Sequence, residues 1–181
     1  MAFNINDIRS NLALGGARPT LFRVEITNPV NNNGDSIAPF LIQTTSLPAS
    51  TIGAIEVPYF GRKIKIAGDR TFDTWNVTVM NDEDFKVRHP LEQWHNQINS
   101  LQSNLNQGSS SAPSLYKSTA LVTQYGKSGE TLRQYQFNGI FPTEISTIDL
   151  DWNATDTIET FSVTFAYDWF EVVGGNTGTV Q

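Results

Sequence analysis

The sequence predicts a mainly β fold, an antiparallel β-sandwich or barrel with one flanking α-helix and an extended hairpin. Along most of the chain, apolar and polar residues alternate with a period of two, which is typical of half-buried strands. One segment instead repeats its apolar residues every three or four positions, as an amphipathic helix does. Clusters of Gly, Pro, Asn and Ser separate these segments and indicate turns. Many short strands with a single helix favour packed antiparallel sheets.

The chain of 181 residues is long enough to bury roughly 70% of the surface that its unfolded form exposes. We therefore expect residues 1–181 to form a single domain. Residues 1–18 are expected to be an N-terminal arm, because their apolar side chains show no clear period and Gly15-Gly16 ends the segment. Residues 174–181 are polar and are expected to be a flexible C-terminal tail.

The first half of the chain contains the expected strands 19–26, 39–45 and 71–80, with a turn-rich break at 28–35. Between them, residues 51–67 predict a hairpin that turns near Gly61. Tyr59 and Phe60 fall at the tip of this hairpin. Two large apolar groups at a tip either fold against their own domain or are covered by something else, and the sequence leaves both possibilities open.

The second half begins with the predicted helix, which starts near Pro90. Its apolar stripe consists of Leu91, Trp94, Ile98, Leu101 and Leu105. A polar linker follows at 104–114 and is expected to be a surface loop. The remaining strands are expected at 115–125, 131–141, 144–152 and 157–172.

Composition and charge argue against several classes of function. The formal net charge is −6, and there is no cysteine, so neither a disulfide nor a thiolate zinc site is expected. Basic residues gather between Arg62 and Arg70, whereas no Lys or Arg follows Arg133 and seven acids do. An acidic chain of this kind is not expected to bind nucleic acid specifically. No secretory signal or run long enough to span a bilayer is present, so no membrane anchor is expected.

The sequence contains little that resembles a catalytic or metal site. His89 and His95 lie six positions apart, which does not place both on one helical face. Asp149, Asp151 and Asn153 resemble the start of a calcium loop, but Ala154 stands where the required glycine should be. We therefore expect no enzyme activity, no cofactor and no metal.

Three stretches of sequence carry a family resemblance. They are GARPTLFRV at 16–24, KIAGDRTFDTWNVTVMND at 65–82 with its continuation into the helix, and the aromatic strand at 157–170. Together they resemble the tail tube proteins of contractile-tailed bacteriophages, and they cover most of the chain in order.

The resemblance implies a structural virion protein whose hexameric rings stack into the inner tail tube, a conduit for DNA during ejection. It implies contacts with a tail sheath protein, baseplate and tail terminator proteins, and a tape measure protein in the lumen. DNA would pass through without specific binding. The chain would be found in the virion tail, and in the host cytoplasm during assembly. Tube proteins of extracellular contractile injection systems and of type VI secretion share this fold and remain the alternative.

Within such a tube, two sets of residues are predicted to lie at functional surfaces. The hairpin would dock one ring on the next through Ile55, Val57, Tyr59, Phe60, Lys63 and Lys65. The lumen would be lined by polar strand faces, namely Thr74, Asn76, Thr78, Thr160, Ser162 and Thr164. These faces could equally meet solvent or a neighbouring layer. A carbohydrate-binding β-sandwich and a hydrolase on a β scaffold are the rival classes.

Overall fold

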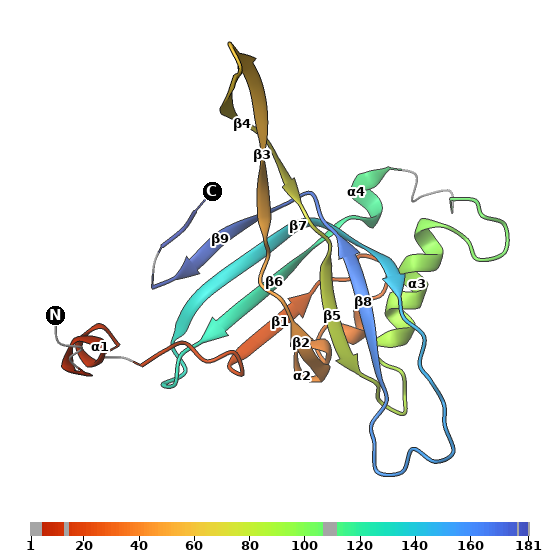
Figure 1. Cartoon of the computed structure of the whole chain (residues 1–181). Coiled ribbons are helices and arrows are strands. Elements are labelled where there is room, and N and C mark those ends of the chain that lie inside the picture. The colour runs from red at the N-terminus through yellow and green to blue at the C-terminus, as the bar shows by residue number, and fades with distance from the viewer. Residues whose placement is uncertain (1–4, 13–14, 107–111, 177, 181) are drawn as a thin grey trace.

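The computed structural model describes residues 5–12, 15–106, 112–176 and 178–180. Its principal elements are two antiparallel sheets, a long hairpin and one helix that packs on the core (Figure 1). In chain order they are α1 Ile5–Asn11, β1 Phe22–Ile26, η1 Asn32–Gly34, α2 Ala38–Leu41, β2 Ile42–Thr45, β3 Ser50–Tyr59, β4 Arg62–Phe72, β5 Trp75–Met80, α3 Arg88–Ile98, α4 Pro113–Tyr116, β6 Ser118–Tyr125, β7 Thr131–Ile145, β8 Thr160–Ala166 and β9 Trp169–Gly175.

The long strand β7 belongs to both sheets of the sandwich. Its first part pairs with β6 and β9, and its last part, Phe141–Ile145, pairs with β8. The first sheet therefore runs β1-β6-β7-β9 and the second runs β7-β8-β5-β2. The transition falls at Gly139, where the register shifts and φ is 70°. Any Cβ at this position would meet the carboxylate of Asp168, so a glycine is required.

The hydrophobic core lies between the two sheets. Trp75 of β5 stacks on Phe137 of β7 with ring centroids 4.4 Å apart, and both side chains are fully buried. The Trp75 Nε1–H donates to Thr45 Oγ1 and to the Ser46 carbonyl, each at 3.0 Å. The predicted alternation is confirmed here, because every second residue of β5 and of β8 is buried.

Helix α3 covers one side of this core. Trp94 is fully buried and its Nε1–H donates to the Tyr116 carbonyl at 2.8 Å. The helix ends at Ile98, and Asn99 is extended. The predicted continuation of the apolar stripe is therefore wrong beyond Ile98, since Leu101 and Leu105 lie outside the helix and are exposed.

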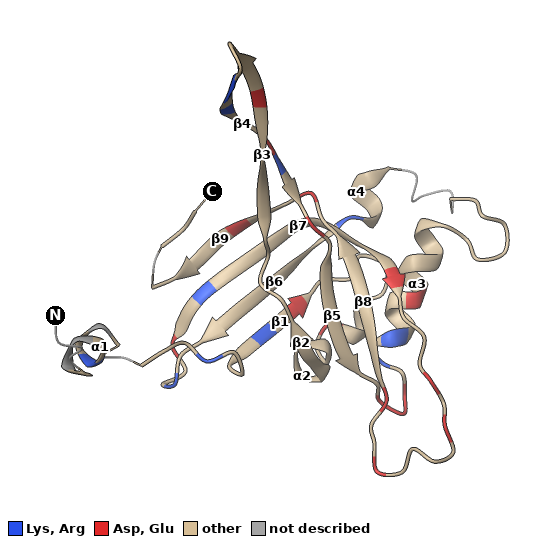
Figure 2. Ribbon diagram, viewed as in Figure 1, with Lys and Arg blue, Asp and Glu red and all other residues tan. Residues whose placement is uncertain are grey.

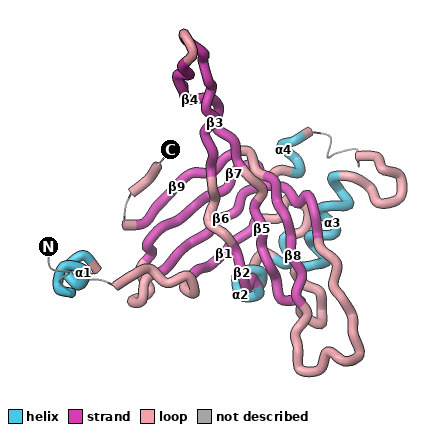
Figure 3. The backbone as a smooth tube through the Cα atoms, viewed as in Figure 1, coloured by secondary structure: helices cyan, strands magenta, loops and turns pink. Residues whose placement is uncertain are grey.

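Four further predictions from sequence differ from the structure. The expected strand 144–152 stops at Ile145, and residues 146–159 form a long loop (Figure 3). The expected strands 39–45 and 115–125 each begin with a short helix, α2 or α4, because a proline at the first or second position sets a helical φ. The expected strand 157–172 begins only at Thr160 and breaks between β8 and β9.

The terminal segments and the linker are described only in part. The N-terminal segment contains α1, which lies apart from the sheets (Figure 1). Near the other terminus, Val180 and Val172 exchange two backbone hydrogen bonds of 3.0 Å. Residues 107–111 of the predicted linker 104–114 lie outside the described residues.

Candidate assembly interfaces

The β3–β4 hairpin projects from the sandwich, and along most of its length no other described segment packs against it (Figure 1). The register pairs Ile55 with Ile66 and Val57 with Ile64, so these four side chains share one face. All four are exposed. Two strands alone are only marginally stable in water, so an exposed aliphatic face on such an element is unusual.

The opposite face of the hairpin is charged. Lys63 and Lys65 lie on it, with Glu56 opposite Lys65. The Lys63 ammonium binds the Glu56 carboxylate at 2.6 Å, so part of the basic charge is already neutralised within the hairpin. The six predicted docking residues therefore divide between the two faces and the tip, with Ile55, Val57 and Tyr59 on the aliphatic face.

The tip of the hairpin is a turn of two residues, Phe60 and Gly61. Both have positive φ, 43° and 78°, as the tightest hairpin turns require. Positive φ is unfavourable for a bulky residue, yet the Phe60 side chain is 92% exposed and packs only edge-on against Tyr59. Strain of this kind is most often kept at functional sites.

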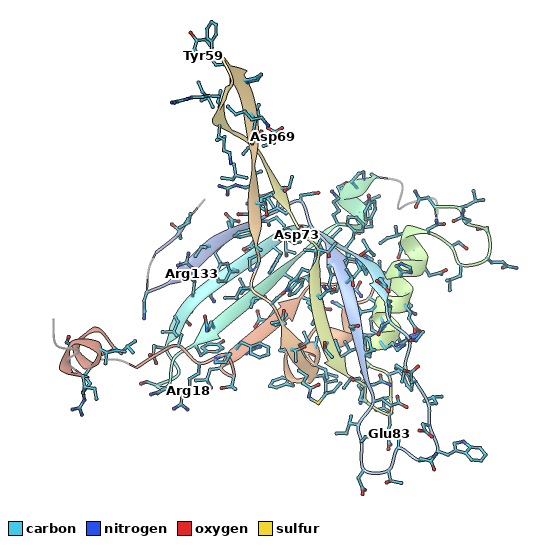
Figure 4. The ribbon with its side chains drawn as sticks, viewed as in Figure 1. Arg18, Tyr59, Asp69, Asp73, Glu83 and Arg133 are labelled. Atoms are coloured by element: carbon cyan, nitrogen blue, oxygen red, sulfur yellow. The ribbon has the colours of Figure 1, made fainter. Side chains whose placement is uncertain are left out.

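The root of the hairpin is anchored in the sandwich by aromatic side chains. Phe72, at the end of β4, contacts Tyr167 and Phe170 with ring centroids 5.8 and 5.6 Å apart. Tyr167 in turn packs against the buried Phe137 at 5.0 Å. Burial and the nearby Asp73 carboxylate raise the pKa of Tyr167, which keeps its hydroxyl protonated. Figure 4 shows Asp73 at this root and Tyr59 at the far tip.

The predicted lumen residues come together on the outer face of the β5–β8 pair. Asn76 lies opposite Thr164, and Thr78 lies opposite Ser162. The Thr164 hydroxyl donates to Asn76 Oδ1 at 2.7 Å. Thr160 continues this face opposite Met80, and Thr74 precedes β5. Neither strand contains a Lys or Arg, so this face carries no positive charge of its own.

Two residues of the aliphatic hairpin face, Ile64 and Ile66, are absent from the predicted set of docking residues. The sequence does carry a signal for them, because the two isoleucines alternate with Lys63 and Lys65. Once the register is known, their cross-strand partners Val57 and Ile55 complete the face.

The remaining polar clusters do not assemble into a metal site. Among the described residues, no three His, Asp or Glu side chains are placed to hold a metal ion. His89 Nε2 instead contacts Gln93 Nε2 at 3.0 Å, and Asp151 accepts from the Asn153 backbone N–H at 2.9 Å. No helix in the part of the chain that the structure describes is long and apolar enough to cross a membrane.

Comparison with known proteins places this architecture in context. Residues 17–173 match the family model described as phage tail tube protein. The tail tube protein gp19 of Enterobacteria phage T4 is 40% identical over 156 residues, covering 86% of this chain and 91% of that protein. The tail tube protein of Serratia phage KSP90 is 25% identical over 168 residues, covering 90% and 93%.

Solved structures share the fold at lower identity. A chain of the anti-feeding prophage baseplate, symmetrised sixfold, superposes with a TM-score of 0.65 at 12% identity, covering 89% of this chain and 97% of that one. A chain from the sheath/tube terminator of an extracellular contractile injection system has a TM-score of 0.64 at 16% identity, with 88% and 97% covered. At such identities the likeness concerns the fold alone.

Proposed function

Because the chain belongs to the phage tail tube protein family, we propose that it assembles as hexameric rings that stack into the inner tube of a contractile tail. It is a structural protein of the virion tail. The observation that carries the assignment is 40% identity over 156 residues to the T4 tail tube protein. The injection-system alternative is not favoured, because those structures match at 12–16% identity. In this proposal the whole chain acts as one tail tube domain.

The β3–β4 hairpin is the axial connector in this proposal. Ile55, Val57, Tyr59 and Phe60 would be buried by the neighbouring ring, while Lys63 and Lys65 would set the register. The exposed aliphatic face and the strained, exposed Phe60 support this role. Apolar burial would supply most of the strength, at about 1.5 to 3 kcal/mol per fully buried large side chain. Exposed ion pairs add only about 0 to 1 kcal/mol each.

The polar face of the β5–β8 pair is the lumen wall in this proposal, formed by Thr74, Asn76, Thr78, Thr160, Ser162 and Thr164. Its contiguity in the sheet and its lack of basic residues support the assignment. A wall without positive charge would let DNA slide, because it offers no Lys or Arg to neutralise the phosphates and release their condensed counterions. Tubes should therefore not retain double-stranded DNA at low salt. Retention that is reversed as the salt concentration rises would contradict this lumen assignment.

The partners of such a tube are a sheath protein, a baseplate, a terminator and a tape measure protein. Assembly would take place in the host cytoplasm. Support for the first three comes from the similar structures, which were solved in sheath-tube, baseplate and terminator complexes. The tape measure protein and the site of assembly rest on the family relationship alone.

Negative-stain electron microscopy of the purified chain, with size-exclusion chromatography, tests the proposed assembly. We expect rings with a central hole, and tubes as the protein concentration rises. A ligand-binding sandwich would instead elute as a monomer at every concentration. A protein that stays monomeric throughout would contradict the proposal.

A further inference from the structure

The end of the molecule opposite the hairpin tip carries a concentration of acidic residues. This acidic end consists of the turn 81–85 and the loop 146–159, which contain seven Asp and Glu and no Lys or Arg. Figure 2 shows these acids below the sheets, while the hairpin above carries basic residues. Glu83 and Tyr59 mark the two ends in Figure 4. The neighbouring Lys86 is already paired with Asp84.

The acidic end also exposes large apolar side chains. Trp152 is fully exposed, at 102% of its reference area, and Leu150, Ile158 and Phe85 are exposed as well. Two open hollows lie among them. One is about 490 Å³ and is lined by Phe85, Ile158 and their neighbours, and the other is about 610 Å³ and includes Leu150 and Trp152. These volumes fall within the range of pockets that accept ligands, so large side chains could enter.

The backbone of the acidic end is held to the sheets at the base of the loop. The Ser146 N–H donates to the Ser162 carbonyl, and the Asn81 N–H donates to the Glu159 carbonyl, each at 2.8 Å. The Asn81 side-chain amide also donates to the Glu159 carboxylate at 3.0 Å. A loop that is fixed at its base and presents apolar groups beside carboxylates is suited to bind another protein surface.

We propose that the acidic end is the receptor for the β3–β4 hairpin of a second copy of this chain in the adjacent ring. The hairpin, residues 50–72, has four cations against two acids and a formal net charge of +2. It presents aliphatic and aromatic groups beside those cations, and the acidic end presents apolar groups beside carboxylates. The two surfaces are complementary, because both present apolar groups and their charges are of opposite sign. Because they lie at opposite ends of one chain, their contact is heterologous and propagates into an open filament.

This inference rests on the proposed role of the hairpin in stacking, and cross-linking tests it directly. The chain has no cysteine, so engineered cysteines are unique. Tubes are co-assembled from a Pro58→Cys chain and an Ala154→Cys chain, exposed positions close to the contact residues Phe60 and Trp152, and treated with a flexible bismaleimide. We expect covalent dimers containing one chain of each kind. The matched control pairs Pro58→Cys with Leu101→Cys, an exposed position beside α3, and should give none. Equal cross-linking in both mixtures, or none in the first, would overturn the inference.

A charge exchange tests the electrostatic half of the interface. The hairpin variant combines Arg62→Glu with Lys65→Glu, and the loop variant combines Glu83→Lys with Asp149→Lys. Each variant alone should raise the critical concentration for tube growth about threefold to tenfold. All four substitutions in one chain restore complementarity at every interface and should bring this concentration back to within about twofold of the wild type. Additive losses in the combined variant would contradict direct pairing.

Truncation of the exposed tryptophan tests the apolar half. Trp152→Ala should raise the critical concentration at least about tenfold, since aromatic anchors dominate interfaces. Single rings should still form, as judged by chromatography. If hairpin shortening stops elongation while Trp152→Ala has no effect, the receptor is wrong and the proposed stacking role of the hairpin stands. If the wild-type chain forms no rings at all, the proposed function itself fails.

Discussion

The β5–β8 and β3–β4 pairs are both antiparallel ladders with one apolar and one polar face, but only the first buries its apolar face. Trp75 and Val77 of β5 lie opposite Phe165 and Val163, and all four are buried. In the hairpin, by contrast, the equivalent aliphatic face is exposed along its length.

The difference lies in what packs on each pair. The β5–β8 pair faces β7 of the other sheet and α3. The hairpin projects from the sandwich beyond its root at Phe72, and no other described element covers its aliphatic face. A period of two therefore specifies a strand with one apolar face, but not whether the covering surface comes from the same chain. In the proposed tube, the surface that covers the hairpin comes from a second copy of the chain.

The largest effect on stability is expected from truncation of the core ladder. Trp75→Ala should lower the free energy of unfolding by about 3 to 5 kcal/mol, because it leaves a cavity and removes two side-chain hydrogen bonds. Urea denaturation of the subunit measures this change. The matched control is Tyr59→Ala, which truncates an exposed aromatic side chain of the β3–β4 hairpin. This variant should change the free energy of unfolding by less than about 0.5 kcal/mol. Similar losses in both variants would show that the hairpin face is covered within the subunit.

Shortening the hairpin should separate folding from assembly. We expect replacement of residues 58–63 by a two-residue Asn-Gly turn, which keeps Val57 paired with Ile64, to leave the melting temperature nearly unchanged, because the removed side chains are exposed. Rings should form but not elongate, as seen by electron microscopy. Tubes of normal length from this variant would move the axial contact to the N-terminal arm or the C-terminal tail.

Reversing charge on the opposite hairpin face should have a smaller effect. Lys63→Glu with Lys65→Glu should raise the critical concentration for tube growth by only a few-fold, roughly tenfold at most, because exposed ion pairs contribute little. The loss should shrink as salt rises, since exposed charges are then screened. A static light-scattering series in salt measures it. An effect as large as that of the shortened hairpin would mean that charge, rather than apolar burial, holds the rings together.

The smallest effects concern two carboxyl groups, the partly buried Asp35 and the exposed Asp84 of the turn 81–85. Burial raises the pKa of Asp35, although the Asn28 N–H lowers it in part, and the Lys86 ammonium lowers the pKa of Asp84. A raised folded pKa gives stability that is lost as pH rises through it, and a lowered one gives stability that is lost as pH falls. Relative to wild type, Asp35→Asn should therefore become more stable from about pH 3 to about pH 7, and Asp84→Asn less stable. Melting temperatures of both variants and of wild type check these opposite signs.

Local pattern was sufficient to predict the sheet core and the hairpin. Alternation identified Val77, Val79, Phe161 and Val163 as one-sided strand residues, and the structure buries them all. The same rule failed at residues 146–152, where Ile148, Leu150 and Trp152 alternate without a partner strand. A segment forms a strand only where another strand lies beside it, and that partner comes from a distant part of the chain. A segment with alternating residues but no partner strand therefore remains a loop.

The end of α3 could not be predicted for a related reason. Leu101 continues the helical spacing, but Asn99 and Asn104 bond to each other through their side chains at 2.7 Å and close a turn instead. Short amide side chains compete with helical hydrogen bonds in this way.

The polar face of the β5–β8 pair could be predicted only in part. The sequence predicted which residues share that face, but the direction in which it points in a tube depends on contacts between subunits.

The near continuity of β4 with β5 determines how the subunit would bear mechanical load. Only Asp73 and Thr74 separate the two strands, and β5 is hydrogen-bonded to β8 on one side and to β2 on the other. A pull along the hairpin therefore reaches β5 lengthwise. The backbone hydrogen bonds between β5 and its two neighbours are then loaded together in shear, instead of opening one after another as in peeling. A subunit pulled by its hairpin would therefore resist extension at this joint until the whole ladder of β5 gives way.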